Sequence, residues 1–275
     1  MTWGTDVPPP AHQVPRARWG LVALRVLALA ALIGVGLAVH LTLRLIERPL
    51  FGLRRPLSPW ITQGVCRLAL AIIGLRLRVT GRPMGASGAL VANHVSWLDI
   101  FVLNALDRVY FVAKGEVARW PVIGVLARVT GTVFIRRDRR EAARQKLLFE
   151  ARLRAGQRLL FFPEGTSTDG LRVLPFKSTL FAALFEPGLR AGVHVQPVSL
   201  SYRAPSGREA RFFGWWGGMD FAGHFLSVLA QWPQGGVEVV FHPPRAVADH
   251  AERKALAAAC GADIAAAVAA RLPEG

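Results

Sequence analysis

Cysteine is scarce in this sequence, which has 275 residues and only two cysteines, Cys66 and Cys260. A small secreted protein held together by disulfides is therefore excluded, because that class packs many cysteines into a short chain. Charged residues make up 19% and hydrophobic residues 52%, so the chain is not a disordered basic tail. A membrane span needs about 20 apolar residues, and at most one run in this sequence comes near that length. A polytopic transporter is therefore excluded. The length allows one globular domain or two.

Acidic residues are also few, with 18 Asp+Glu against 34 Lys+Arg and a formal net charge of +16. Four of the 34 cationic residues are lysines, so the other 30 are arginines. An excess of positive charge favours an anionic partner, either nucleic acid or an anionic membrane surface. Because the mean hydropathy is positive, at +0.32, the membrane is the favoured partner.

The first 80 residues predict a leader followed by a membrane-anchoring segment. Residues 1–19 contain four prolines and no apolar periodicity, which predicts a disordered leader. Residues 26–43 are 18 residues without a formal charge, a candidate for a single membrane span. A cleaved signal peptide is the alternative, since Arg16, Arg18 and Arg25 supply positive charge before the run. The second apolar patch, 68–75, is either an interfacial helix or a core helix.

Cationic residues crowd the C-terminal side of the apolar run, from Arg44 to Arg78. By the positive-inside rule, the body of the chain faces the cytoplasm. We therefore predict a location at the inner membrane, with residues 20–80 as membrane-anchoring or interfacial helices.

From residue 81 to residue 275, short apolar runs alternate with segments of helical periodicity. The predicted strands are 88–94, 109–113, 131–136, 158–163, 193–202 and 237–242. Continuous hydrophobic strands that alternate with helices predict an α/β domain with a mostly parallel sheet flanked by helices. Residues 247–272 predict a closing Ala-rich helix, with a possible break at Gly261.

A histidine and an aspartate follow the first predicted strand of this domain. His94 and Asp99 are five residues apart, and on one helix they would point about 140° apart. They can meet if His94 ends the strand loop and Ser96 caps the next helix, with Asp99 in its first turn. A carboxylate on one ring nitrogen fixes the tautomer and leaves the other nitrogen free to take a proton. A capping Asp beside an ordinary loop histidine is the alternative.

Two further strand ends carry polar residues. The segment 131–140 ends in paired arginines, among them Arg136 and Arg137, whose planar guanidinium groups suit phosphate recognition. In 161–170, Glu164 and Gly165 come directly after an apolar strand. A charge at that place is costly unless it accepts hydrogen bonds, and glycine permits close approach of a ligand. Three polar strand ends in one α/β sheet indicate the usual ligand crevice.

Four segments together resemble the sequence blocks of the glycerolipid acyltransferase family, whose best-known members are the 1-acylglycerol-3-phosphate acyltransferases. These segments are NH-x4-D at 93–99, GTVFIRR at 131–137, FPEGT at 162–166 and QPVSL at 196–200. They follow the family's order and approximate spacing over about residues 85–205, and 111–124 resembles the family's linking segment.

The resemblance implies transfer of a fatty acyl chain from acyl-carrier protein or coenzyme A to a lysolipid hydroxyl, with no cofactor. His94 would be the general base, Asp99 would orient it, and no acyl-enzyme would form. The absence of a G-x-S-x-G motif agrees with direct transfer. His94 has no second His or Cys at ligand spacing, so no metal site is expected. The residues that the resemblance assigns to the acceptor are Lys114, Arg136, Arg137, Glu164, Gly165 and Thr166.

The third block departs from the pattern of many phosphatidate-forming members. Ser167 stands where those members have an arginine that contacts phosphate. FPEGTSTDG at 162–170, with WWGGMD at 215–220, is more similar to the bacterial branch that acylates lyso-ornithine lipid. The acceptor therefore stays open between lysophosphatidate and lyso-ornithine lipid.

Two other functions stay open on the sequence alone. One is a non-catalytic protein that binds a membrane surface or nucleic acid through its arginine-rich segment 136–158. Aromatic residues are not interleaved with that segment as stacking platforms, so a nucleic-acid partner is not expected. The other is a hydrolase of the same lipids, with water in place of the acceptor.

Overall fold

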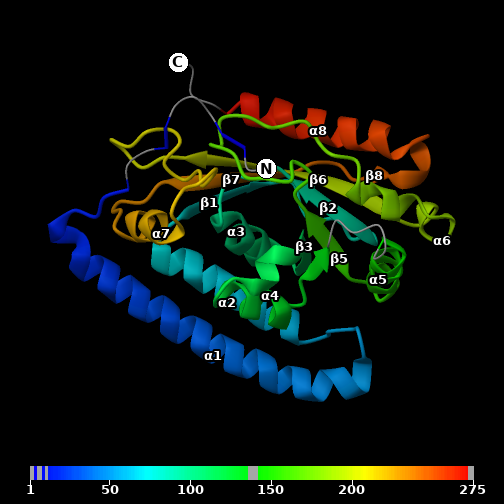
Figure 1. Cartoon of the computed structure of the whole chain (residues 1–275), viewed down its shortest axis with the longest axis horizontal. Helices are drawn as coiled ribbons and strands as arrows, with labels where there is room; N and C mark the ends of the chain where they lie inside the picture. The colour runs from blue at the N-terminus through cyan, green and yellow to red at the C-terminus, as the bar shows by residue number, and fades with distance from the viewer. Residues whose placement is uncertain (1–2, 5–7, 10–11, 136–141, 272–275) are drawn as a thin grey trace.

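The apolar runs of the sequence form the inner strands of one eight-stranded sheet (Figure 1). The computed structural model describes residues 3–4, 8–9, 12–135 and 142–271. The strands are β1 (Arg76–Thr80), β2 (Gly88–Ala92), β3 (Val109–Lys114), β4 (Val133–Ile135), β5 (Arg158–Phe161), β6 (His194–Arg203), β7 (Gly236–Phe241) and β8 (Arg245–Ala246).

The strand order is β1-β7-β6-β2-β5-β3-β4, with β8 paired to β6. Only the pairs β6–β7 and β6–β8 are antiparallel, which confirms the mostly parallel sheet. The sequence did not predict β1 or β8. Strand β1 reads RLRVT and lies at the edge with most of its residues exposed, so it lacks the continuous apolar run that marks the inner strands.

Helices cover both faces of the sheet. They are α1 (Trp19–Phe51), α2 (Ser58–Ile73), α3 (Leu98–Leu106), α4 (Ile123–Thr130), α5 (Ala142–Arg154), α6 (Pro187–Arg190), α7 (Phe221–Leu229) and α8 (Arg253–Ala269). Leu90 and Ala92 of β2 belong to one core with α2, α3 and α7. Ala89 and Val91 belong to a second core with α5 and α8. Helix α8 runs through Gly261 without the break that the sequence allowed.

Helix α1 lies along the domain and packs against α2, α4 and α7 (Figure 1). Three polar side chains fix it at separate points. Arg25 donates to two carbonyl groups at and just after the end of α7, at 2.7 and 2.9 Å. His40 contacts a carbonyl of α4, and Glu47 accepts hydrogen bonds from the amides of Leu57 and Ser58. Helix α1 is therefore held against the domain along much of its length.

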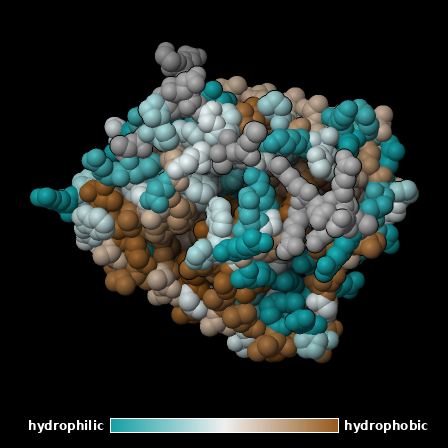
Figure 2. Space-filling model, viewed as in Figure 1, coloured by the Kyte–Doolittle hydropathy of each residue, from teal (hydrophilic) through white to brown (hydrophobic). Residues whose placement is uncertain are grey.

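The other face of α1 is apolar and exposed, with Leu27 69% and Leu45 78% exposed. Hydrophobic residues gather along the lower left and lower edge of the molecule, where α1 runs (Figure 2). By length and composition, Arg16–Phe51 could cross a membrane, although its contacts place it along the domain. The apolar patch 68–75 begins in the last turns of α2 and ends just after that helix. Leu70 and Ile73 belong to the core, and Leu68 is exposed.

Several described residues of the predicted leader, among them Trp3 and His12, contact the domain. The Trp3 ring lies 6.3 Å from the ring of Trp216. The His12 ring packs edge-on against His224, with 4.8 Å between centroids. The segment boundaries at residues 19 and 80 stay predictions.

Candidate active site

The polar strand ends that the sequence singled out lie at one edge of the sheet. His94 follows β2, Glu164 follows β5, and Lys114 ends β3, in strands that are parallel neighbours. Because parallel strands all point the same way, their carboxyl ends share one edge, where α/β domains bind ligands.

His94 and Asp99 meet at this edge. Helix α3 begins at Leu98, so Asp99 falls in its first turn and its side chain points back toward the strand loop. The distance between His94 Nδ1 and Asp99 Oδ2 is 2.8 Å. Ser96 is not the cap that the sequence predicted: Trp97 is the N-cap residue, and the buried Ser96 hydroxyl has no hydrogen-bond partner among the described residues.

Asp99 is completely buried and accepts three more hydrogen bonds. The amides of Val95 and Ser96 donate to Oδ2 at 2.8 and 3.0 Å. The Tyr202 hydroxyl donates to Oδ1 at 2.7 Å. Burial, followed by the charge of Asp99, raises the pKa of Tyr202 well above its ordinary value, so the hydroxyl keeps its proton and donates. These contacts fix the carboxylate in one orientation.

Tyr202 is a site residue that sequence reasoning missed. It lies two positions after the QPVSL block, near the end of β6. The spacing of the two residues gave no sign of the contact, because 103 positions separate Tyr202 from Asp99. The neighbouring QPVSL block was the one feature of the sequence that could have pointed to Tyr202.

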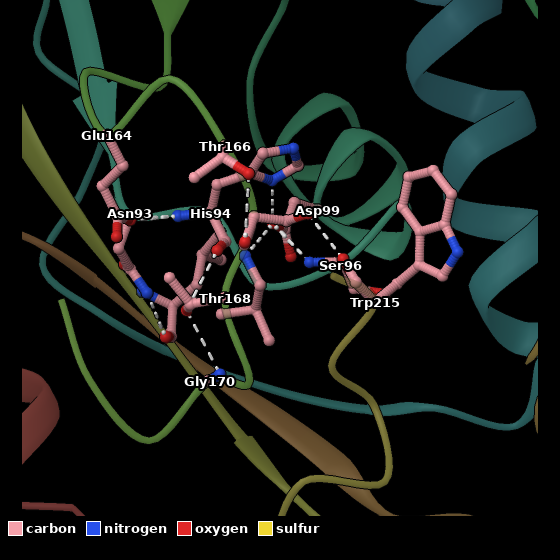
Figure 3. A network of polar contacts seen from close by, with 12 residues as sticks. Asn93, His94, Ser96, Asp99, Glu164, Thr166, Thr168, Gly170 and Trp215 are labelled. Carbon is pink, nitrogen blue, oxygen red and sulfur yellow. Dashed lines mark hydrogen bonds and ion pairs between the residues drawn. The ribbon is translucent and has the colours of Figure 1, made fainter. Parts of the chain in front are cut away.

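The His94 ring is stacked on Phe162, with 4.0 Å between centroids and 11° between planes. Its side chain is 21% exposed. Since an ionised carboxylate only accepts hydrogen bonds, Nδ1 carries the proton and Nε2 holds a free lone pair. Within the described part of the chain, no side chain or carbonyl forms a hydrogen bond with Nε2. The backbone is fixed as well, because the Thr168 amide donates to the His94 carbonyl (Figure 3).

Glu164 joins the two loops that form the site. Its Oε1 accepts from the amide of His94 and its Oε2 from the amide of Leu174, both at 2.7 Å. The side chain is only 1% exposed, and burial raises the pKa of its carboxyl to about 8 against the effect of these two hydrogen bonds. Glu164 thus positions the histidine loop.

The remaining predicted residues divide into three groups. Gly165 has φ +74°, a conformation that favours glycine, and the Thr166 hydroxyl oxygen accepts from the amide of Trp3 at 3.4 Å. Lys114 is half-buried at the end of β3, paired with Ile135 in the sheet register. Arg136 and Arg137 lie outside the described residues.

Ser167 and Asp169 point into the protein. The Ser167 hydroxyl donates to the carbonyl of Trp215. Asp169 is buried and forms an ion pair with Arg172 at 3.1 Å.

The two cysteines lie away from this edge. Cys66 is on α2 and Cys260 on α8, in the two cores on opposite faces of the sheet. Burial raises the pKa of each thiol to about 12, so neither is a thiolate at neutral pH. Over residues 12–135 and 142–271, no group of three or more His, Cys, Asp and Glu side chains could hold a metal ion.

Comparisons with known proteins agree with this geometry. The Acyltransferase family model matches residues 76–201. The chain is 58% identical to a lyso-ornithine lipid O-acyltransferase of Rhodobacter capsulatus over 95% of each chain. It is 43% identical to a 1-acyl-sn-glycerol-3-phosphate acyltransferase of Neisseria gonorrhoeae over 51% of this chain and 55% of that protein.

A solved structure shares the fold. The crystal structure of the 1-acyl-sn-glycerophosphate (LPA) acyltransferase from Thermotoga maritima superimposes with a TM-score of 0.64. The match covers 94% of this chain and 99% of that one at 20% sequence identity. The comparisons support the enzymatic alternative over the non-catalytic one.

Proposed function

This chain belongs to the acyltransferase family, and we propose that it moves a fatty acyl chain from an acyl thioester to a lysolipid hydroxyl, with His94 as the general base. Lysolipid acyl transfer is the activity that its relatives' names share. One observation carries the mechanism, namely the 2.8 Å contact of His94 Nδ1 with the buried Asp99. That contact leaves Nε2 open at the sheet edge.

In the proposed reaction, His94 Nε2 takes the proton of the lysolipid hydroxyl as its oxygen attacks the thioester carbonyl. The new C–O bond forms, the tetrahedral intermediate collapses, and the C–S bond breaks. The imidazolium then returns the proton to the leaving thiolate. Asp99 stabilises the positive charge that His94 carries between these steps, without taking the proton itself.

Direct transfer is supported by the state of the thiols. A covalent acyl-enzyme through cysteine requires a thiolate near the base. Cys66 and Cys260 are buried in the two cores, with the pKa of each thiol raised to about 12. Either cysteine would be a poor nucleophile, and neither contacts His94.

For the acceptor, we favour lyso-ornithine lipid over lysophosphatidate. Three further relatives named lyso-ornithine lipid O-acyltransferase are 40–41% identical over about two thirds of this chain. Ser167 supports the same choice, because its hydroxyl is engaged by Trp215 and it offers no cation to a phosphate. The acyl donor stays a choice between acyl-carrier protein and coenzyme A thioesters.

We further propose that α1 lies in the membrane interface, with its apolar face among the lipids. Its exposed leucines need an apolar surrounding, whereas Arg25, His40 and Glu47 tie its other face to the domain. A helix that crossed the bilayer would pull these contacts into hydrocarbon, where polar groups are costly. The net charge of +16 favours an anionic leaflet. The inner membrane, with the domain toward the cytoplasm, remains our predicted location.

An acyl-transfer assay tests the proposal directly. Wild-type protein is offered lyso-ornithine lipid and lysophosphatidate side by side, with each class of thioester, and the products are separated by chromatography. We expect faster acylation of lyso-ornithine lipid. The variant His94→Ala should lose about 100- to 10,000-fold in rate, the usual contribution of a general base.

Three controls decide what a negative result means. His94→Ala should keep the wild-type melting temperature and should still float with anionic liposomes. Retained activity in that variant would refute His94 as the base. Release of free fatty acid without any acylated lysolipid would show a hydrolase instead. Wild-type protein that remained with the pellet would refute the membrane proposal.

A further inference from the structure

The turn after β5 lacks the cation that its sequence block supplies in many similar enzymes. Ser167 stands at that position, and its hydroxyl is bound to the Trp215 carbonyl. Arg172, the next cation along the chain, is paired with the buried Asp169. A negatively charged headgroup that reached this turn would therefore need another partner.

The side chain of Lys177 supplies a cation at this turn. Its amide donates to the carbonyl of Pro163 at 3.0 Å, and its side chain lies back across Gly165. A Cβ on Gly165 would be 3.0 Å from Lys177 Nζ. Any other side chain there would meet the lysine, in addition to the strain of φ +74°. Gly165 thus leaves room for the ammonium group directly above the turn.

The Lys177 ammonium is also available. Among the residues that the structure describes, no carboxylate forms an ion pair with it. The charge of Lys177 lowers the pKa of the Glu164 carboxyl, although less than burial raises it. Both oxygens of Glu164 already accept backbone amides and the side chain is buried. Lys177 itself is exposed, so its charge faces the solvent side of the site.

The position of Lys177 suits a headgroup whose hydroxyl is at His94. Strands β2 and β5 are neighbours, so the turn at Gly165 and the loop at His94 start about 4.8 Å apart. In a lyso-ornithine lipid, the reacting hydroxyl and the ornithine carboxylate are joined by about seven covalent bonds, a reach of up to about 8 Å. Strand β4, at the far end of the sheet order, lies three strands from β2, or about 14 Å.

From these contacts we propose that Lys177 binds the oxyanion of the acceptor headgroup, the carboxylate of ornithine in the favoured acceptor. The assignment rests on the proposed function. Lys177 determines acceptor specificity and takes no part in proton transfer. A lysophosphatidate phosphate presents the same chemistry, so the acceptors in the test separate the two sources.

The test compares Lys177→Met, Lys177→Arg and wild type on three acceptors. These are lyso-ornithine lipid, the same lipid with its carboxylate converted to a neutral carboxamide, and lysophosphatidate. For Lys177→Met with lyso-ornithine lipid, we expect KM to rise about 10- to 100-fold, the effect of losing a hydrogen bond between charged groups. The kcat should stay within about threefold. Lys177→Arg should restore most of the affinity.

The carboxamide acceptor distinguishes a direct contact between Lys177 and the carboxylate from a structural role of Lys177 in holding the turn. Wild type should bind it as weakly as Lys177→Met binds the natural acid, and Lys177→Met should lose nothing further. An equal loss on acid and amide would show that Lys177 only holds the turn and would overturn the proposal. An unchanged KM would overturn it too. A loss that appears only with lysophosphatidate would assign Lys177 to phosphate and refute the carboxylate.

Two controls complete the design. Lys146→Met removes an exposed lysine of α5 that pairs with Glu186, and its KM should match wild type. Melting temperatures show which variants are folded, and Lys177→Arg preserves the test if Lys177→Met is not. If wild type acylates none of the three acceptors, the proposed function fails. If wild type is active and Lys177→Met equals it, only this inference fails.

Discussion

At the corner between α1 and α2, the buried carboxylate of Glu47 accepts hydrogen bonds from two successive amides at the start of α2. At the edge of the sheet, Asp99 does the same for two successive amides just before α3. Both side chains are at most 1% exposed. The amides that precede a helix lack partners within it, and a carboxylate satisfies them.

The two regions differ in the third partner of the carboxylate. Glu47 also accepts from Arg44, whose guanidinium stays charged at any accessible pH and gives up no proton. Asp99 also holds His94 and Tyr202, and an imidazole changes its charge near neutral pH. The same local arrangement therefore stabilises a corner in one region and orients a base in the other. The partner, rather than the carboxylate, determines whether chemistry is available.

Among the buried carboxylates, the largest effect on kcat is expected at Asp99. Asp99→Asn keeps the shape of the side chain but removes the charge that stabilises the imidazolium and fixes the tautomer. We expect kcat to fall about 100- to 1,000-fold with KM within a few-fold. Steady-state kinetics with saturating thioester give both constants.

Tyr202→Phe is the matched control, since it removes one hydrogen bond from Asp99 and leaves its charge. It should cost about tenfold or less in kcat. An Asp99→Asn enzyme within a few-fold of wild type would mean that the His94–Asp99 contact is structural, like that of Glu47.

Glu47 should show the opposite result. Glu47→Ala removes the partner of the Leu57 amide and leaves the buried Ser58 amide without one, which should lower the free energy of unfolding by about 2–3 kcal/mol. Its kcat, measured well below the melting temperature, should remain near wild type because the hydrogen bonds of Glu47 go to Arg44, Leu57 and Ser58 and to no residue of the site. Urea titration in detergent micelles measures the stability, and the assay above measures kcat.

Glu47→Gln keeps an oxygen for the amides and should lose less stability than Glu47→Ala. The comparison between the two regions fails if Glu47→Ala lowers kcat as strongly as Asp99→Asn while the protein remains folded.

Much of the fold could be predicted from the sequence because the inner strands are buried on both faces. Such strands read as unbroken apolar runs, and β2, at the centre, is fully buried over Gly88–Ala92. Strand β1 escaped prediction because Arg76 and Arg78 alternate with apolar residues at an exposed edge. Helix α1 extends beyond the uncharged run because its charged residues find partners in the domain.

The site could be predicted only in part, for a reason that lies in the chain's topology. His94 and Asp99 are close in sequence, and a helix begins between them. Their contact could therefore be predicted from the local sequence alone. Tyr202 and Lys177 reach the same edge from other parts of the chain, on β6 and on the segment after β5. The prediction that Glu164 positions substrate did not include its two contacts with backbone amides, which join two loops. Periodicity and spacing carry no information on such long-range pairings.

The smallest effect concerns Glu164, the third buried carboxylate with two amide partners. Burial raises the pKa of its carboxyl from 4.5 to about 8, so the folded protein binds this proton more tightly than the unfolded chain. The resulting stability is complete below about pH 4.5 and is lost as the pH rises toward about 8. Glu164→Gln does not titrate. The melting temperature of wild type should therefore exceed that of Glu164→Gln most at about pH 5, and the gap should narrow by a few degrees by about pH 8. A gap that stays constant from about pH 5 to about pH 8 would show that Glu164 is ionised in the folded protein throughout this range. Its two amide bonds would then outweigh its burial, and all three carboxylates would stabilise their loops through charge.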